Sequence, residues 1–187
     1  MYMYKTICIT NRHLVQGDYF KQIEKAAAQN PDAVILREKD LSENEYTDIA
    51  ENIIKICSQY DVKCILHTFE NVAISLGVRD IHMPLRQLIS MTDEQKKSFD
   101  NIGASTHSVE DAILAEKNGA SYITAGHVFA TDCKKGVPPR GLDFLEAVCK
   151  AVSIPVYAIG GVHKNNAMDC IKAGAAGVCM MSEFMQL

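Results

Sequence analysis

The chain has 187 residues, enough for one domain, and its 48% hydrophobic and 22% charged residues are an ordinary globular balance. Its formal net charge of -4 argues against attraction to nucleic acid or to an anionic membrane. Seven scattered cysteines without a Cys-x-x-Cys pair, an N-terminus unlike a signal peptide and no membrane-length apolar stretch indicate a cytoplasmic protein.

Short apolar runs rich in β-branched residues alternate with longer helical patterns along the chain. The strand-like runs occupy residues 4–10, 33–39, 63–67, 80–83, 101–105, 121–126, 156–160 and 177–181. The clearest helical patterns occupy residues 42–59, 108–118, 141–151 and 164–173. Ser42 with Glu45 forms a capping box, and Gly119 and Gly174 follow two of the helices as C-terminal signals.

Eight strands that alternate with helices predict a parallel sheet, which is either open or closed into a barrel. Eight is the number of strands in a closed TIM barrel, and the Gly-x-Gly-x-x-Gly pattern of a dinucleotide-binding fold does not follow the first strand. We therefore predict an α/β protein with one domain, residues 1–187, folded as a compact (β/α)8 TIM barrel. Because the chain is short for this fold, we expect tight loops and a shortened C-terminal helix.

The active site of such a barrel lies at the C-terminal ends of the strands, and two cations end the second one. Arg37 and Lys39 project to one face by the alternation of a strand, whereas Glu38 projects to the other. Two cations on a largely apolar face are costly to bury without an anion. The anion is either a substrate group or a carboxylate of a neighbouring strand, and the sequence leaves both open.

Paired glycines follow the seventh strand, where barrels often bind phosphate. Gly160 and Gly161 would let backbone N–H groups approach a phosphate, with Ser182 after the eighth strand as a further contact. The alternative is a tight turn that needs positive φ angles.

The sixth strand ends at His127, and a long loop, residues 128–141, follows it. Loops of this length between tight connections are usually functional, and this one carries Thr131 and Lys134. An imidazole with a pKa near ~6.5 can both accept and donate a proton at neutral pH. A histidine that is merely hydrogen-bonded in the barrel rim is the alternative. His67 is a possible pocket-lining residue, and Ser105 is read as structural or anion-binding.

Four segments carry a resemblance to a known family over nearly the whole chain. They are Arg37-Glu38-Lys39, Gly103-Ala104-Ser105-Thr106-His107-Ser108, Gly126-His127-Val128-Phe129 with Thr131-Asp132-Cys133-Lys134-Lys135-Gly136, and Ala158-Ile159-Gly160-Gly161. In this order they resemble the thiamine phosphate synthase superfamily. The third segment resembles its thiazole tautomerase branch, whose members were once described as regulators of extracellular enzyme production. That resemblance implies that His127 is the catalytic residue.

The chain departs from the synthase pattern at two places. A synthase carries Asn-Asp-Arg after strand three and Gly-Gln-x-Asp after strand four, and the two aspartates hold the magnesium that binds diphosphate. Here these places read His67-Thr68-Phe69 and Pro84-Leu85-Arg86-Gln87. Because Mg²⁺ is normally held by carboxylates, we expect no metal and no cofactor.

The resulting expectation is a thiazole tautomerase of thiamine biosynthesis that moves a proton to convert an exocyclic-alkene thiazole carboxylate phosphate into the aromatic thiazole. The residues expected to bind the substrate or its phosphate are Arg37, Lys39, Ser105, Thr131, Lys134, Gly160, Gly161 and Ser182. The alternatives are a thiamine phosphate synthase, which joins a pyrimidine diphosphate to thiazole phosphate, and a non-catalytic regulator that binds thiazole phosphate. The expected partner is the small phosphorylated thiazole, without nucleic acid or membrane, and a homodimer is among the arrangements that the sequence allows.

Overall fold

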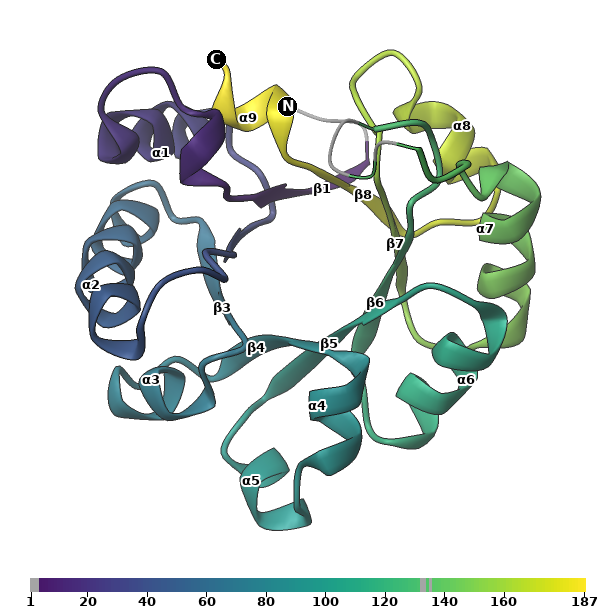
Figure 1. The fold of residues 1–187 in the computed structure, drawn as a ribbon, viewed down its shortest axis with the longest axis horizontal. Coiled ribbons are helices and arrows are strands. Elements are labelled where there is room, and N and C mark those ends of the chain that lie inside the picture. Colours follow the sequence, from purple (N-terminus) through teal and green to yellow (C-terminus); the bar gives the residue numbers. More distant parts are fainter. Residues whose placement is uncertain (1–3, 132–133, 135) are drawn as a thin grey trace.

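The structure of the protein is a computed structural model that describes residues 4–131, 134 and 136–187. In this part of the chain, eight parallel strands pair in sequence order, and β8 pairs with β1 to close the sheet. Helices surround the closed sheet, as Figure 1 shows. The predicted (β/α)8 barrel is confirmed. No helix of the described residues is both long and apolar enough to cross a membrane.

Every predicted strand is present, with ends that differ from the prediction by at most three residues. The strands are β1 (Lys5–Ile9), β2 (Ala33–Leu36), β3 (Lys63–His67), β4 (Asp80–Pro84), β5 (Asn101–Thr106), β6 (Tyr122–Gly126), β7 (Val156–Ile159) and β8 (Gly177–Met180). The helices are η1 (Arg12–Leu14), α1 (Tyr19–Ala28), α2 (Glu43–Gln59), α3 (Glu70–Ser75), α4 (Leu85–Ser90), α5 (Asp93–Lys97), α6 (Val109–Lys117), α7 (Gly141–Ala151), α8 (Ala167–Lys172) and α9 (Ser182–Met185).

Local capping explains where several helices begin. Ser42 and Glu45 form both halves of the predicted capping box at the start of α2. α8 begins at Ala167 rather than at 164, because Asn166 holds the preceding residues in a turn. Its Nδ2 donates to the Gly161 carbonyl at 2.9 Å, and its Oδ1 accepts from the His163 N–H at 2.9 Å. The predicted short final helix is the four-residue α9.

Two apolar clusters lie on opposite faces of the closed sheet. The larger cluster fills the space between strands and helices, and the smaller one fills the barrel interior. The interior cluster contains Ile7, Ile9, Ala33, Ile35, Ile65, Tyr122 and Cys179. Since alternate residues of a strand face the same way, these positions show which side chains at the strand ends face the mouth of the barrel.

Candidate functional site

Two histidines lie side by side at the C-terminal end of the barrel interior. His67 of β3 is in register with His82 of β4, and their rings stack with centroids 5.6 Å apart. His82 Nε2 lies 2.9 Å from Ser105 Oγ of β5. The Ser105–His82 pair is a feature that the sequence reasoning missed. Strand alternation could have found it, because His82 and Ser105 occupy interior positions of neighbouring strands.

Burial and nearby cations keep both imidazoles neutral. His67 and His82 are each 3% exposed. Burial lowers the pKa of His82 to about 3, with further contributions from Lys39 and then Arg37. Burial, followed by His82, Lys39 and Arg37, also lowers the pKa of His67. These two rings are therefore poor proton carriers at neutral pH, although each can donate and accept a hydrogen bond.

Arg37 and Lys39 follow β2 beside the two histidines. Burial, Arg37 and Lys134 together lower the pKa of Lys39, so Lys134 of the long loop lies near the end of β2. Within the described residues, neither Arg37 nor Lys39 has a carboxylate within salt-bridge distance. The alternative that a carboxylate of a neighbouring strand neutralises these two cations is therefore wrong. We call Arg37, Lys39, His67, His82 and Ser105 the imidazole side of the mouth.

Glu38, between the two cations, faces the opposite side of the strand as predicted. Its carboxylate is 2% exposed and accepts hydrogen bonds from Thr10 Oγ1 at 2.9 Å, Tyr19 Oη at 2.9 Å and Arg12 Nη1 at 3.0 Å. These contacts join the end of β2 to the segment that follows β1. Because Glu38 is hydrogen-bonded to neighbours on the outer face, it does not neutralise the half-buried Arg37 or the exposed Lys39.

His127 lies directly after β6 and is 4% exposed. Its Nε2 lies 3.3 Å from the carbonyl oxygen of Val137, which belongs to the long loop. A carbonyl only accepts, so Nε2 carries the proton in this contact and Nδ1 carries the lone pair. His127 Nδ1 is buried without a hydrogen-bond partner among the described residues. Such atoms are uncommon in folded proteins and call for an explanation.

The two glycines after β7 pack against the residues that begin the long loop. Gly160 has a φ of 94°, and a Cβ there would lie 2.6 Å from His127 Cα. Gly161 has a φ of 66°, and a Cβ there would lie 2.8 Å from Phe129 Cβ. Positive φ angles and this close approach explain both glycines, and their phosphate contact stays a prediction. We call His127, Val137, Gly160 and Gly161 the loop side of the mouth.

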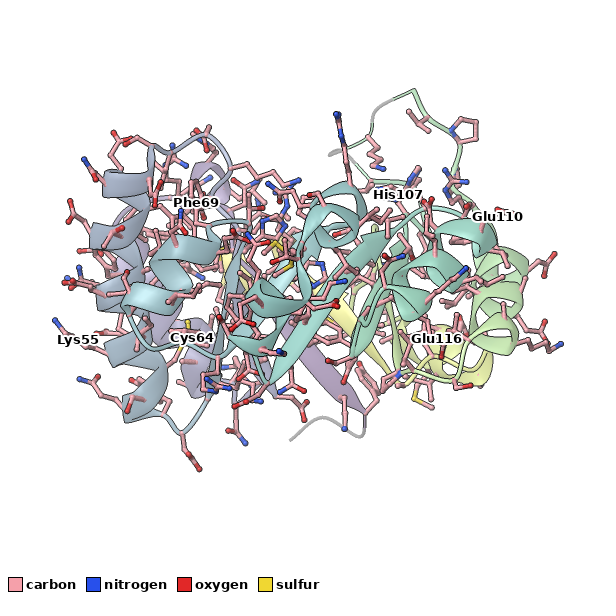
Figure 2. The ribbon with its side chains drawn as sticks, turned by 90° about the horizontal axis from the view of Figure 1, so that it is seen from below. Lys55, Cys64, Phe69, His107, Glu110 and Glu116 are labelled. Atoms are coloured by element: carbon pink, nitrogen blue, oxygen red, sulfur yellow. The ribbon has the colours of Figure 1, made fainter. Side chains whose placement is uncertain are left out.

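The remaining predicted contacts come from the loop and from the last helix. Thr131 is half-buried, whereas Lys134 and Ser182, at the start of α9, are exposed. Asp132, Cys133 and Lys135 of the same motif lie outside the described residues. Figure 2 shows Phe69 and His107, which follow β3 and β5, toward the same end of the barrel. The His107 Nδ1 lies 2.9 Å from the Gly126 carbonyl oxygen, next to His127.

The strand ends offer few ligands for a hard cation. The part of the chain that the structure describes contains no group of three or more His, Cys, Asp or Glu that could hold a metal ion. β3 ends at His67 and Thr68 follows it, whereas β4 ends at Pro84 and Gln87 lies three residues further on. Mg²⁺ prefers carboxylate oxygens in octahedral geometry, so the imidazole, hydroxyl and amide groups at these places fit it poorly.

A cavity of about 380 Å³ lies beside the mouth, outside the barrel. Its lining residues are Glu43, Thr68, Phe69, Glu70, Asn71, Met83, Gln87, Ser90, Met91 and Gln95. They come from the start of α2, the β3–α3 connection and the region of α4 and α5. The Gln95 amide donates to Glu70 Oε1 at 2.7 Å, so part of the polar lining is already paired.

Comparison with known proteins gives consistent matches over nearly the whole chain. Residues 6–184 match the family model described as "Thiamine monophosphate synthase". The chain is 35% identical to a thiamine-phosphate synthase of Caldanaerobacter subterraneus over 91% of this chain and 81% of that one. It is 30% identical to one of Clostridium tetani, over 95% and 86%. A thiamine phosphate pyrophosphorylase structure from Pyrococcus furiosus matches with a TM-score of 0.82 and 27% identity, covering 97% and 93%.

Proposed function

The chain belongs to the thiamine monophosphate synthase family, and we propose that within this family it is a thiazole tautomerase that transfers a proton at His127. The observation that carries the proposal is the buried Nδ1 of this histidine, which has no hydrogen-bond partner among the described residues. A lone pair that none of these residues occupies is available to a substrate proton.

His127 would act as both base and acid in the proposed reaction. Nδ1 takes a proton from a ring carbon of the exocyclic-alkene thiazole, and the same imidazole returns a proton to the exocyclic carbon. The double bond thereby moves into the ring, and the composition of the substrate is unchanged. The Val137 carbonyl, 3.3 Å from Nε2, stabilises the imidazolium formed between the two transfers. Because the product is aromatic, modest acceleration is sufficient.

The cations of the mouth would hold the negatively charged substrate. Arg37 and Lys39 have no carboxylate partner among the described residues, and Lys134 lies near Lys39. A phosphate or carboxylate would relieve the repulsion among these cations. Gly160, Gly161 and Ser182 are proposed phosphate contacts, with Ser105 and Thr131 as lesser ones, and His67 would line the pocket.

The names of the relatives favour a second candidate, thiamine phosphate synthesis. The similar proteins from Caldanaerobacter subterraneus and Clostridium tetani are both thiamine-phosphate synthases. In this reading the same cations would bind the diphosphate. The observation that separates the candidates is the donor set after β3 and β4, where the hydroxyl of Thr68 and the amide of Gln87 stand in place of the carboxylates of the synthase pattern.

Two parallel assays test the proposal. The chain is incubated with the exocyclic-alkene thiazole carboxylate phosphate, and separately with pyrimidine diphosphate, thiazole phosphate and Mg²⁺. We expect isomerisation in the first assay and no thiamine phosphate in the second. Thiamine phosphate formation without isomerisation would establish the synthase, and tight binding without either product would establish a non-catalytic binding protein.

The His127→Asn variant assigns the role of the imidazole. We expect its isomerisation rate to fall by roughly 10²- to 10⁴-fold, the usual range for losing an acid–base group. The matched control is His13→Asn, which removes an exposed imidazole and should keep the wild-type rate. Near-normal turnover in His127→Asn, with an unchanged circular dichroism spectrum, would remove this residue from the mechanism.

A further inference from the structure

Three polar side chains form a line from the centre of the barrel to its mouth. Tyr122 Oη lies 3.1 Å from His82 Nδ1, and His82 Nε2 lies 2.9 Å from Ser105 Oγ. Tyr122 and His82 are buried, whereas Ser105 is half-buried at the mouth. The line joins three different strands, β6, β4 and β5, so the barrel itself brings these groups together.

The absence of a side chain at Gly103 makes room for the side chains of Tyr122 and His82. A Cβ at Gly103 would collide with the Tyr122 ring and hydroxyl and would lie 2.5 Å from His82 Nδ1. Gly103 does not have a positive φ, so the backbone conformation does not explain the absence of a side chain. The close approach of Tyr122 and His82 does explain it.

The proton positions along the line follow from the donors and acceptors present. His82 is neutral, so one of its ring nitrogens carries a proton and the other accepts. His82 Nδ1 is the hydrogen-bond partner that the described residues offer to the Tyr122 hydroxyl. If Nδ1 carried the proton, the buried O–H of Tyr122 would have no acceptor, which is unfavourable. Tyr122 therefore donates to Nδ1, and the Nε2–H of His82 donates to Ser105 Oγ.

We propose that Tyr122 and His82 form a buried relay that fixes Ser105 as a hydrogen-bond donor to an anionic oxygen of the substrate. With its oxygen already accepting from His82, Ser105 directs its own O–H toward the mouth, near Arg37 and Lys39. His82 and Tyr122 are positioning residues in this arrangement. That the anion is a thiazole phosphate or carboxylate rests on the proposed function, whereas the direction of the relay does not.

The direction of the relay also decides against Ser105 as a nucleophile. A serine–histidine pair activates the hydroxyl only when the imidazole accepts the serine proton. Here the imidazole donates to the serine oxygen, and its other nitrogen is occupied by Tyr122. We therefore expect Ser105 in the full-length chain to resist phenylmethylsulfonyl fluoride. Covalent labelling at Ser105 would overturn the relay.

Nuclear magnetic resonance of the ¹⁵N-histidine-labelled, ligand-free chain reads the proton positions directly. We expect His82 to be protonated at Nε2 and unprotonated at Nδ1 at pH 7.5, and the opposite tautomer would overturn the proposal. This measurement needs neither substrate nor turnover. A chain that fails to isomerise thiazole but shows this tautomer would contradict the proposed function and leave the relay standing.

Titration with inorganic phosphate tests the consequence for anion binding. We expect Tyr122→Phe to weaken phosphate affinity roughly 3- to 10-fold, because His82 then loses its fixed tautomer. Ser105→Ala should weaken it at least as much, and the double variant should show no further loss.

Tyr157→Phe is the matched control for Tyr122→Phe, since the ring of this neighbouring tyrosine lies edge-on to the Tyr122 ring, with the two ring centroids 5.7 Å apart. Folded Tyr122→Phe protein with unchanged affinity and an unchanged His82 tautomer would overturn the proposal, and if that variant does not fold, the Ser105→Ala titration decides alone.

Discussion

The two sides of the barrel mouth differ in how completely their polar atoms are paired. On the imidazole side, His82 has hydrogen-bond partners at both nitrogens, and Ser105 has one at its oxygen. On the loop side, His127 is equally buried but leaves Nδ1 without a partner among the described residues. A fully paired imidazole holds its neighbours in place, whereas an unpaired one is free to exchange a proton. In the proposed function, the imidazole side positions the substrate and the loop side carries out the proton transfer.

The difference also shows in what fixes the backbone on each side. On the imidazole side, His67, His82 and Ser105 are strand residues whose interior positions are set by sheet register. The loop side depends on Gly160 and Gly161, which lie against the first residues of the long loop. We therefore expect substitutions of Gly160 or Gly161 to change structure and activity together, and those on the imidazole side to change mainly binding.

The largest expected effect comes from Gly160→Ala. The new methyl group would meet His127 in a backbone conformation with a φ of 94°, so we expect a loss of roughly 2–5 kcal/mol of unfolding free energy. Gly119→Ala is the control, because its φ is 89° but no atom lies within 4 Å of the added Cβ. It should cost roughly 1–2 kcal/mol. Urea unfolding measures both, and equal losses would contradict the packing argument.

Lys39→Met should weaken anion binding without unfolding the barrel. A charge-assisted hydrogen bond is lost, so we expect the affinity for inorganic phosphate to fall roughly 10- to 100-fold, with His127-dependent turnover retained at saturating substrate. Lys55→Met is the control, since Figure 2 shows Lys55 at the outer side of α2. Isothermal titration measures the two affinities. An equal change in both variants would remove Lys39 from the anion site.

The smallest expected effect is a change in how steeply the unfolding free energy depends on pH, measured per pH unit. Burial and nearby cations lower the pKa of His82 to about 3, while the unfolded chain has a value near ~6.5. The unfolded state therefore binds more protons between these values, and stability is full above ~6.5 and falls as the pH drops toward 3. His82 contributes at most ~1.4 kcal/mol per pH unit, and His67 acts in the same direction.

The His82→Gln variant isolates this contribution from that of the carboxylates. Between about pH 6.5 and 5, where most carboxylates stay ionised, its unfolding free energy should change less steeply with pH than that of the wild type. Urea unfolding at a series of pH values gives the two slopes. Parallel slopes would mean that His82 is not neutral in the folded protein.

Strand periodicity made the barrel and its strand ends predictable from the sequence. Apolar, β-branched runs at regular spacing fixed eight strands, and alternation placed Glu38 opposite Arg37 and Lys39, as the structure shows. The capping box of Ser42 and Glu45 was equally predictable from the sequence, because the two residues are only three positions apart. The start of α8 at Ala167 was not, since the turn held by Asn166 has no periodic pattern.

The sequence by itself determined the family, the barrel and the strand ends at which its polar residues gather, because these depend on short-range patterns. Only the tertiary structure decided which polar atoms meet. His82 and Ser105 are 23 residues apart, and Tyr122 lies 40 residues from His82, so closure of the barrel is needed to pair them. Likewise, only the tertiary structure shows that His127 Nδ1 has no partner among the described residues, because the Val137 carbonyl and the turn at Gly160 lie far along the chain from the ring that they contact.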